Sequence, residues 1–269
     1  MKIVGSNRDR WRSLGRVLVF MLACAVLLAA IAPLVARLPR DWIPFATGAI
    51  ASLGALILSA MFVRWDGLRL ADVIGTLEPT SLGRLLAGFV IGTALVALWG
   101  FVLGITGQVQ WVRQQQPPLS TCAATLAVYL LLASREELSF HGYPLRRLTD
   151  CFGLWRAQLL VALIFAAEHK LGGLSWTDAL LSAGIGSLLF GITAIATRGL
   201  ATPIGLHAAW NCGQWAFGMR GVPGFFKAVV PENRDGRVHL ASTLISVAIM
   251  SSATLAIWLW HRRRNGLSR

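Results

Sequence analysis

The sequence predicts an all-α fold, a polytopic bundle of about eight helices that span a membrane. Three features predict it: 55% of the 269 residues are hydrophobic, only 14% are charged, and the charges are separated by long uncharged runs. An average soluble domain has about 25% charged residues, so a soluble fold could not cover this much apolar surface. Disorder is excluded because it requires low hydrophobicity. A lipid bilayer is the solvent that fits this composition.

The uncharged runs give the predicted helices in chain order. A spanning helix needs about 20 predominantly apolar residues. Seven runs without Asp, Glu, Lys or Arg have about this length: 17–36, 42–63, 85–112, 114–134, 179–197, 199–219 and 238–261. An eighth run, 157–167, reaches helix length only if the helix continues through Glu168 and His169 to about Leu171.

Membrane topology accounts for the net charge of +13. Eight spans place both termini on one side, and that side holds 17 of the 25 basic residues: Lys2, Arg8, Arg10, Arg12, Arg16, Arg64, Arg69, Arg84, Arg135, Arg146, Arg147, Arg156, Arg198, Arg262, Arg263, Arg264 and Arg269. Because cytoplasmic loops carry the excess of Lys and Arg, both termini are predicted to be cytoplasmic. The partner of this charge is expected to be anionic lipid, and nucleic-acid binding is not expected.

The chain is expected to form one membrane unit with three parts. Residues 1–119 hold the N-terminal helices and loops, 120–218 form a core that carries the polar motifs described below, and 219–269 hold a loop and the final helix. Helix-breaking residues predict a loop at 113–118 and an irregular, non-cytoplasmic connection at 219–238. The four cysteines lack CxxC spacing and are expected to be unpaired apolar residues: Cys24, Cys122, Cys151 and Cys212.

Glycines recur on one face of the third predicted span. Gly88, Gly92, Gly100 and Gly104 lie at steps of four or eight residues. Small residues at this spacing allow a neighbouring helix to approach closely. We interpret this stripe as a packing feature.

A few polar side chains lie within the apolar runs or at their ends. An ionisable side chain at the centre of a span costs about 2.5–3.5 kcal/mol on insertion scales, so such residues usually face the bundle interior and mark function. They are Glu136, Glu137 and His141 on one helix, Glu168 and His169 on the next, and His207 and Asn211 in the run 199–219. Glu137 and His141, Phe165 and His169, and His207 and Asn211 are i, i+4 pairs, so each pair shares a helix face.

These groups suit hydrolysis of a carbonyl compound, most simply a peptide bond. A carboxylate can act as general base or metal ligand, an imidazole can relay a proton, and an amide can donate to a developing oxyanion. Taken singly, each has a structural interpretation. Glu136 and Glu137 next to Arg135 could form a solvated helix end, His169 could be interfacial, and His207 with Asn211 could form an interhelical hydrogen bond.

The joint pattern resembles the CAAX-processing and bacteriocin-processing (CPBP) intramembrane proteases, the type II CAAX prenyl endopeptidase group. That family carries EExxxR, FxxxH and HxxxN/D in this order on successive membrane helices. Here the motifs are Glu136-Glu137-x3-His141, Phe165-x3-His169 and His207-x3-Asn211, and the resemblance covers about residues 120–215. His141 replaces the family arginine and can form a charged pair with Glu137 only when protonated. Either that pairing depends on pH, or His141 has another role, such as a third imidazole near the site.

The resemblance implies an intramembrane endopeptidase that cuts a membrane-associated or lipid-anchored protein or peptide near the bilayer surface. Glu136 and His169 would activate the attacking water, and His207 and Asn211 would stabilise the oxyanion. Glu137 and His141 would orient the first motif, and Phe165 would pack beside His169. The family is described both as metalloproteases, in which Glu136, His169 and His207 would bind Zn²⁺, and as metal-free glutamate enzymes. No HExxH motif is present, and we favour the metal-free chemistry.

Two other functions fit the same residues. A degraded first motif would leave a membrane scaffold or a peptide-binding immunity protein of the same fold. A transporter could use Glu136, Glu137, His169 and His207 as a proton relay. The sequence does not select a substrate or an oligomeric state.

Overall fold

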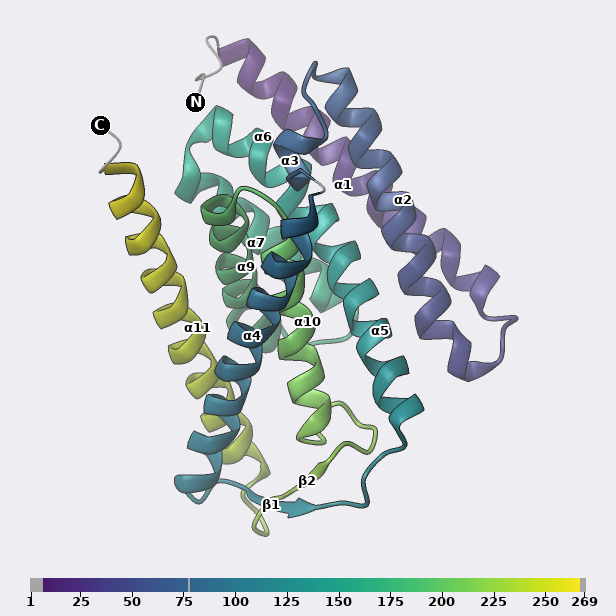
Figure 1. Cartoon of the computed structure of the whole chain (residues 1–269), viewed down its shortest axis with the longest axis vertical. Helices are drawn as coiled ribbons and strands as arrows, with labels where there is room; N and C mark the ends of the chain where they lie inside the picture. The colour runs from purple at the N-terminus through teal and green to yellow at the C-terminus, as the bar shows by residue number, and fades with distance from the viewer. Residues whose placement is uncertain (1–6, 77, 267–269) are drawn as a thin grey trace.

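The computed structural model describes residues 7–76 and 78–266. Lys2 and Arg269, which entered the charge count, lie outside this range. The described chain is a helical bundle, as predicted (Figure 1). Its helices are α1 (Asn7–Val35), α2 (Ile43–Trp65), α3 (Ala71–Ile74), α4 (Pro79–Ile105), α5 (Leu119–Glu136), α6 (Tyr143–Phe152), α7 (Leu154–Leu171), α8 (Trp176–Asp178), α9 (Ile185–Thr197), α10 (Ala201–Ala216) and α11 (Asp235–Gly266).

Every predicted span coincides with a helix, but fewer helices than predicted are long and apolar enough to cross a membrane. In the described part of the chain five stretches qualify: Asn7–Val35, Arg40–Trp65, Ala71–Ile105, Trp176–Thr197 and Asp235–Arg264. The number of eight spans is therefore not confirmed. The three other predicted spans became α5, α7 and α10, and α10 has only 16 residues. All three carry polar residues of the predicted site.

A pair of short strands was not predicted. The run 85–112 was expected to be one helix, but α4 ends at Ile105 and the chain turns at Gly107, whose φ is +67°. Strand β1 (Gln110–Arg113) then pairs antiparallel with β2 (Phe226–Val229) from the connection predicted to be irregular. The strands lie at the end of the bundle opposite the start of α1 and the end of α11 (Figure 1).

Helices α4 and α10 pack closely because glycines line their contact. A Cβ built on Gly88 would lie 2.0 Å from the Thr202 carbonyl oxygen, and one on Gly92 would lie 2.4 Å from that of Leu206. Gly205 of α10 is equally close to the Leu85 carbonyl oxygen. The predicted close approach of a neighbouring helix is confirmed at Gly88 and Gly92. Gly100 and Gly104 face the rings of Phe217 and Trp111 instead.

The helix that carries the first motif changes form at the motif. Helix α5 passes at Glu137 into a π-helical turn, η2 (Glu137–Gly142), all of whose residues are buried. Tyr143 then begins the amphipathic helix α6, and Pro144 lies in its first turn, where proline is tolerated. π-Helical turns widen a helix locally and frequently occur at functional sites. This one holds Glu137 and His141 inside the bundle.

Candidate active site

Glu137 lies at the centre of a buried hydrogen-bonded group. Its side chain is fully buried. Its Oε2 is 2.8 Å from His141 Nδ1, and its Oε1 is 2.9 Å from His207 Nδ1. Because a carboxylate only accepts hydrogen bonds, each imidazole must donate through Nδ1. One carboxylate therefore fixes the orientation of two histidines, one from η2 and one from α10.

His141 is satisfied on both ring nitrogens. Its Nε2 lies 2.9 Å from the Ser187 hydroxyl oxygen of α9. With Nδ1–H donating to Glu137, a neutral ring accepts at Nε2 from the serine hydroxyl. The pairing with Glu137 therefore needs no protonation of the ring, unlike the charged pair considered from the sequence. Neither His141 nor Glu137 is among the residues that line the cavity described below.

Glu136 faces two imidazoles from other helices. Its Oε1 pairs with Arg135 Nη2 at 2.6 Å. Its Oε2 lies 3.6 Å from His207 Nε2 and 4.0 Å from His169 Nε2, and this buried oxygen has no hydrogen-bond partner. His207 thus lies between two carboxylates, with Glu137 at Nδ1 and Glu136 at Nε2.

His169 is also held in one orientation. Its Nδ1 donates to the Phe165 carbonyl oxygen at 3.0 Å, and the Phe165 ring lies 4.4 Å away, centroid to centroid. Since Nδ1 is committed to the helix backbone, Nε2 is the nitrogen available to a reacting group. The predicted packing of Phe165 beside His169 is confirmed.

The first motif does not form a solvated helix end. The side chains of Arg135 and Glu136 are each only 12% exposed, and Arg135 also pairs with Glu168 of α7 at 2.5 Å. This buried triad joins α5 to α7. The alternative that Glu136 and Glu137 end a helix in solvent is therefore wrong.

The atoms of Glu136, His169 and His207 that face one another are farther apart than the ligands of a bound zinc ion. Zinc ligands at about 2.0–2.1 Å in tetrahedral geometry lie about 3.4 Å from one another, whereas Glu136 Oε2 and His169 Nε2 are 4.0 Å apart. Within residues 7–76 and 78–266, no group of three or more His, Cys, Asp or Glu side chains is arranged to hold a metal ion.

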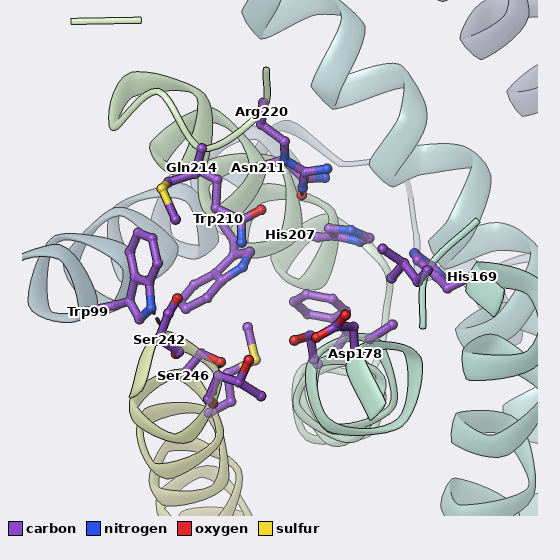
Figure 2. Close-up of a pocket in the computed structure, with 18 of the residues that line it drawn as sticks. Trp99, His169, Asp178, His207, Trp210, Asn211, Gln214, Arg220, Ser242 and Ser246 are labelled. Carbon is purple, nitrogen blue, oxygen red and sulfur yellow. Dashed lines mark hydrogen bonds between the residues drawn. The ribbon is translucent and has the colours of Figure 1, made fainter. Parts of the chain in front are cut away.

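A cavity of about 340 Å³ opens beside these residues. His169, His207 and Asn211 lie on its wall, and Figure 2 shows the two histidines pointing toward the same region. The Phe190 ring stacks on His207 at 4.2 Å, with an interplanar angle of 11°. The rest of the lining is partly aromatic, with Trp99 and Trp210, and partly polar. The cavity could hold the side chains and backbone of an extended peptide.

Asn211 has a partner that sequence reasoning missed. Its Oδ1 accepts a hydrogen bond from the Arg220 guanidinium, which lies over the Tyr129 ring at 5.7 Å. Figure 2 shows Arg220 above Asn211 at the cavity. Since a guanidinium only donates, the amide oxygen must face it and the NH₂ group must face away.

Residues 118–213 match the family model of the Rce1-like type II CAAX prenyl endopeptidases. This region belongs to that family. The family resemblance stated from the motifs is thereby confirmed, and at family level the match indicates a CAAX-type protease. No curated protein matches the chain. The apolar helices and the family together indicate an integral membrane protein.

Every motif residue quoted from the sequence lies within the Rce1-like region, and the structure brings all three motifs together. Three contributing residues were missed. Arg135 was considered only as a neighbour of the motif, and Ser187 lies unmarked in an apolar run. Arg220 lies just beyond the predicted span 199–219, and only the turn after α10 returns it to the site. No sequence spacing indicates that return.

Proposed function

We propose that the chain is an intramembrane endopeptidase that hydrolyses a peptide bond of a membrane-associated or lipid-anchored protein or peptide near the bilayer surface. One observation carries the proposal: Glu136 Oε2 faces the Nε2 atoms of His207 and His169 at 3.6 and 4.0 Å. Each of these distances can be bridged by a water that hydrogen-bonds to Glu136 and to one of the imidazoles. The residues of 120–218 supply this chemistry, and the helices of 1–119 and 219–269 support them.

In this mechanism Glu136 takes a proton from the water while the water oxygen attacks the carbonyl carbon. The carbonyl oxygen becomes an oxyanion and accepts hydrogen bonds from the Asn211 amide and from Nε2–H of protonated His207. Glu137 orients this ring, because its carboxylate accepts from Nδ1 of His207. The proton on Glu136 passes, with His169 as relay, to the leaving amine as the C–N bond breaks.

Glu137, His141 and Ser187 are positioning residues in this proposal. They contact the reacting groups only through His207, which Glu137 holds by Nδ1. His141 stands where the family has an arginine, and its hydrogen bond keeps the Glu137 carboxylate paired. This intact pairing favours an enzyme over a degraded scaffold.

The test compares Glu136→Gln with wild type in cells and in proteoliposomes. We expect the variant to reach the membrane folded and to lose cleavage by about 10²–10⁴-fold, the usual contribution of a general base. Mass spectrometry measures the cleavage from the new protein N-termini that it produces. It also identifies the substrate that the variant traps.

The matched control is Glu232→Gln, the same change at an exposed position of the loop after β2. It should cleave like wild type. Wild-type cleavage by Glu136→Gln would remove the proposed base, and proton-coupled uptake by vesicles without cleavage would favour a transporter.

We also propose that both termini are cytoplasmic. The start of α1 and the end of α11 lie at the same end of the bundle (Figure 1), and 17 of the 25 basic residues were assigned to that side. Cysteine labelling at each end of the chain in intact cells tests the orientation.

A further inference from the structure

A second cavity, of about 460 Å³, lies away from the catalytic groups. It is formed where α4 begins, where the chain passes from α9 to α10, and where α11 ends. Three arginines from these three places line it, namely Arg84, Arg198 and Arg264, together with Thr202 and Trp260. Residues far apart in the sequence thus bring three guanidinium groups to one cavity.

These guanidinium groups form no close ion pair in the described part of the chain, although Glu78 lies near enough to Arg84 for a longer-range attraction. No described carboxylate oxygen lies within 4.0 Å of Arg84, Arg198 or Arg264; the acid pairs of the bundle involve other arginines. Glu78 caps α4 and does not line the cavity. The three guanidinium groups are exposed, so solvent screens part of their mutual repulsion, and an anion with several acceptor oxygens would relieve the rest.

Arg198 occupies a backbone position that seldom takes an arginine. It ends α9 in the left-handed conformation, with φ at +56°, where glycine or asparagine is the usual residue. Residues held in such conformations cluster at ligand-binding sites. Here the left-handed turn sets Arg198 at the cavity between α9 and α10.

The cavity lies at the membrane boundary of the bundle. Helices α4 and α11 are candidate spans, and their ends at this cavity lie at the same end of the bundle as the start of α1 (Figure 1). Trp260 is 44% exposed there, and its ring lies 5.0 Å from the Arg264 guanidinium carbon. Tryptophan is enriched at the level of lipid headgroups, so this position of Trp260 fits a depth near lipid phosphates for the three arginines.

We infer that this cavity binds a phosphate-bearing anion at the membrane surface, through Arg84, Arg198 and Arg264. Arginine forks match phosphate oxygens with two parallel hydrogen bonds, and the Thr202 hydroxyl can donate a further one. The phosphate can belong to a phospholipid headgroup or to a soluble phosphate compound, and the experiment distinguishes the two sources.

The test measures phospholipid binding to the detergent-solubilised full chain by native mass spectrometry. We expect phosphatidylglycerol to bind in preference to phosphatidylcholine. Arg84→Gln, Arg198→Gln and Arg264→Gln should each weaken phosphatidylglycerol binding about fivefold, the factor expected for one basic residue near an anionic surface. Arg263→Gln is the matched control, because Arg263 is exposed like the three cavity arginines and lies on α11 but does not line the cavity.

A second arm adds inorganic phosphate as competitor. Displacement of the lipid by phosphate identifies a phosphate site that soluble compounds also fill, whereas lipid binding that resists phosphate identifies a phospholipid site; both outcomes support the inference. Equal binding of the two lipids, or equal loss in Arg263→Gln, would overturn it, since general surface charge would then explain the result. Thermal unfolding of each variant, with Arg198→Lys as the charge-preserving form, shows that lost binding is not lost folding.

Discussion

The orientation of one amide decides whether Asn211 can stabilise an oxyanion. An asparagine offers an oxygen that accepts and a nitrogen that donates, and only the nitrogen can stabilise negative charge. The contact with Arg220 assigns the oxygen to the guanidinium. In the proposed mechanism Arg220 is therefore a positioning residue, because it acts through Asn211.

Arg220→Ala should lower kcat for the peptide substrate by about tenfold or more, yet by less than the 10²–10³ lost when an oxyanion donor is removed. KM should change little, because the amide is needed chiefly in the transition state. Arg220→Lys should restore part of kcat. Arg234→Ala, an exposed arginine of the same connection, is the control, and a raised KM with unchanged kcat would assign Arg220 to substrate binding instead.

At the scale of elements, the contact between α4 and α10 controls where the second half of the site lies. Helix α10 carries His207 and Asn211, and its backbone is held against α4 by glycines on both helices. A side chain at this contact would displace α10, which carries His207 to Glu137 of η2, and so disturb the hydrogen bond between Glu137 and His207. The close packing of α4 against α10, which the glycines permit, therefore affects the geometry of the site.

Gly88→Ala should destabilise the protein by about 1–3 kcal/mol or more, because its Cβ would lie 2.0 Å from the Thr202 carbonyl oxygen. Activity should fall with stability. Gly83→Ala lies on the same helix with no atom within 4 Å of its Cβ, so it should leave stability unchanged or raise it slightly. Thermal unfolding in detergent measures both, and equal effects would contradict the packing argument.

At the scale of the whole molecule, a buried carboxylate connects the N-terminal helices to the Rce1-like region through hydrogen bonds and ion pairs. Asp66 follows α2, and its side chain is fully buried. It is contacted by Arg16 of α1, by Arg147 of α6 at 3.1 Å and by the Tyr143 hydroxyl at 2.8 Å. Burial and the bond to Asp66 raise the pKa of Tyr143, so the phenol stays protonated and donates.

Asp66→Ala should cost about 1–3 kcal/mol, because it leaves two partly buried arginines and the Tyr143 hydroxyl without their partner. The free energy of unfolding, measured by titration with a denaturing detergent, tests this value. Asp72→Ala is the control: it removes an exposed ion pair with Arg69, and such pairs contribute little. Equal losses of stability in both variants would show that Asp66 does not tie the helices together.

Much of the site could be predicted because its residues recur at helical spacing. Glu137 with His141 and Phe165 with His169 are local pairs, and the structure confirms both contacts. Arg220 and Ser187 could not be predicted, because their partners lie on other elements. The strand pair joins residues more than 110 positions apart, and no local pattern indicates such a pairing.

The sequence by itself determined the helical class, the placement of a helix at each uncharged run and the identity of the three motifs. These follow from composition and from the 3.6-residue period, which act locally along the chain. Only the tertiary structure decided that Glu137 joins His141 to His207, that Glu136 faces two imidazoles and that three distant arginines share one cavity. Such contacts depend on how helices pack against one another, and the close approach permitted by the glycines of α4 and α10 is set in three dimensions.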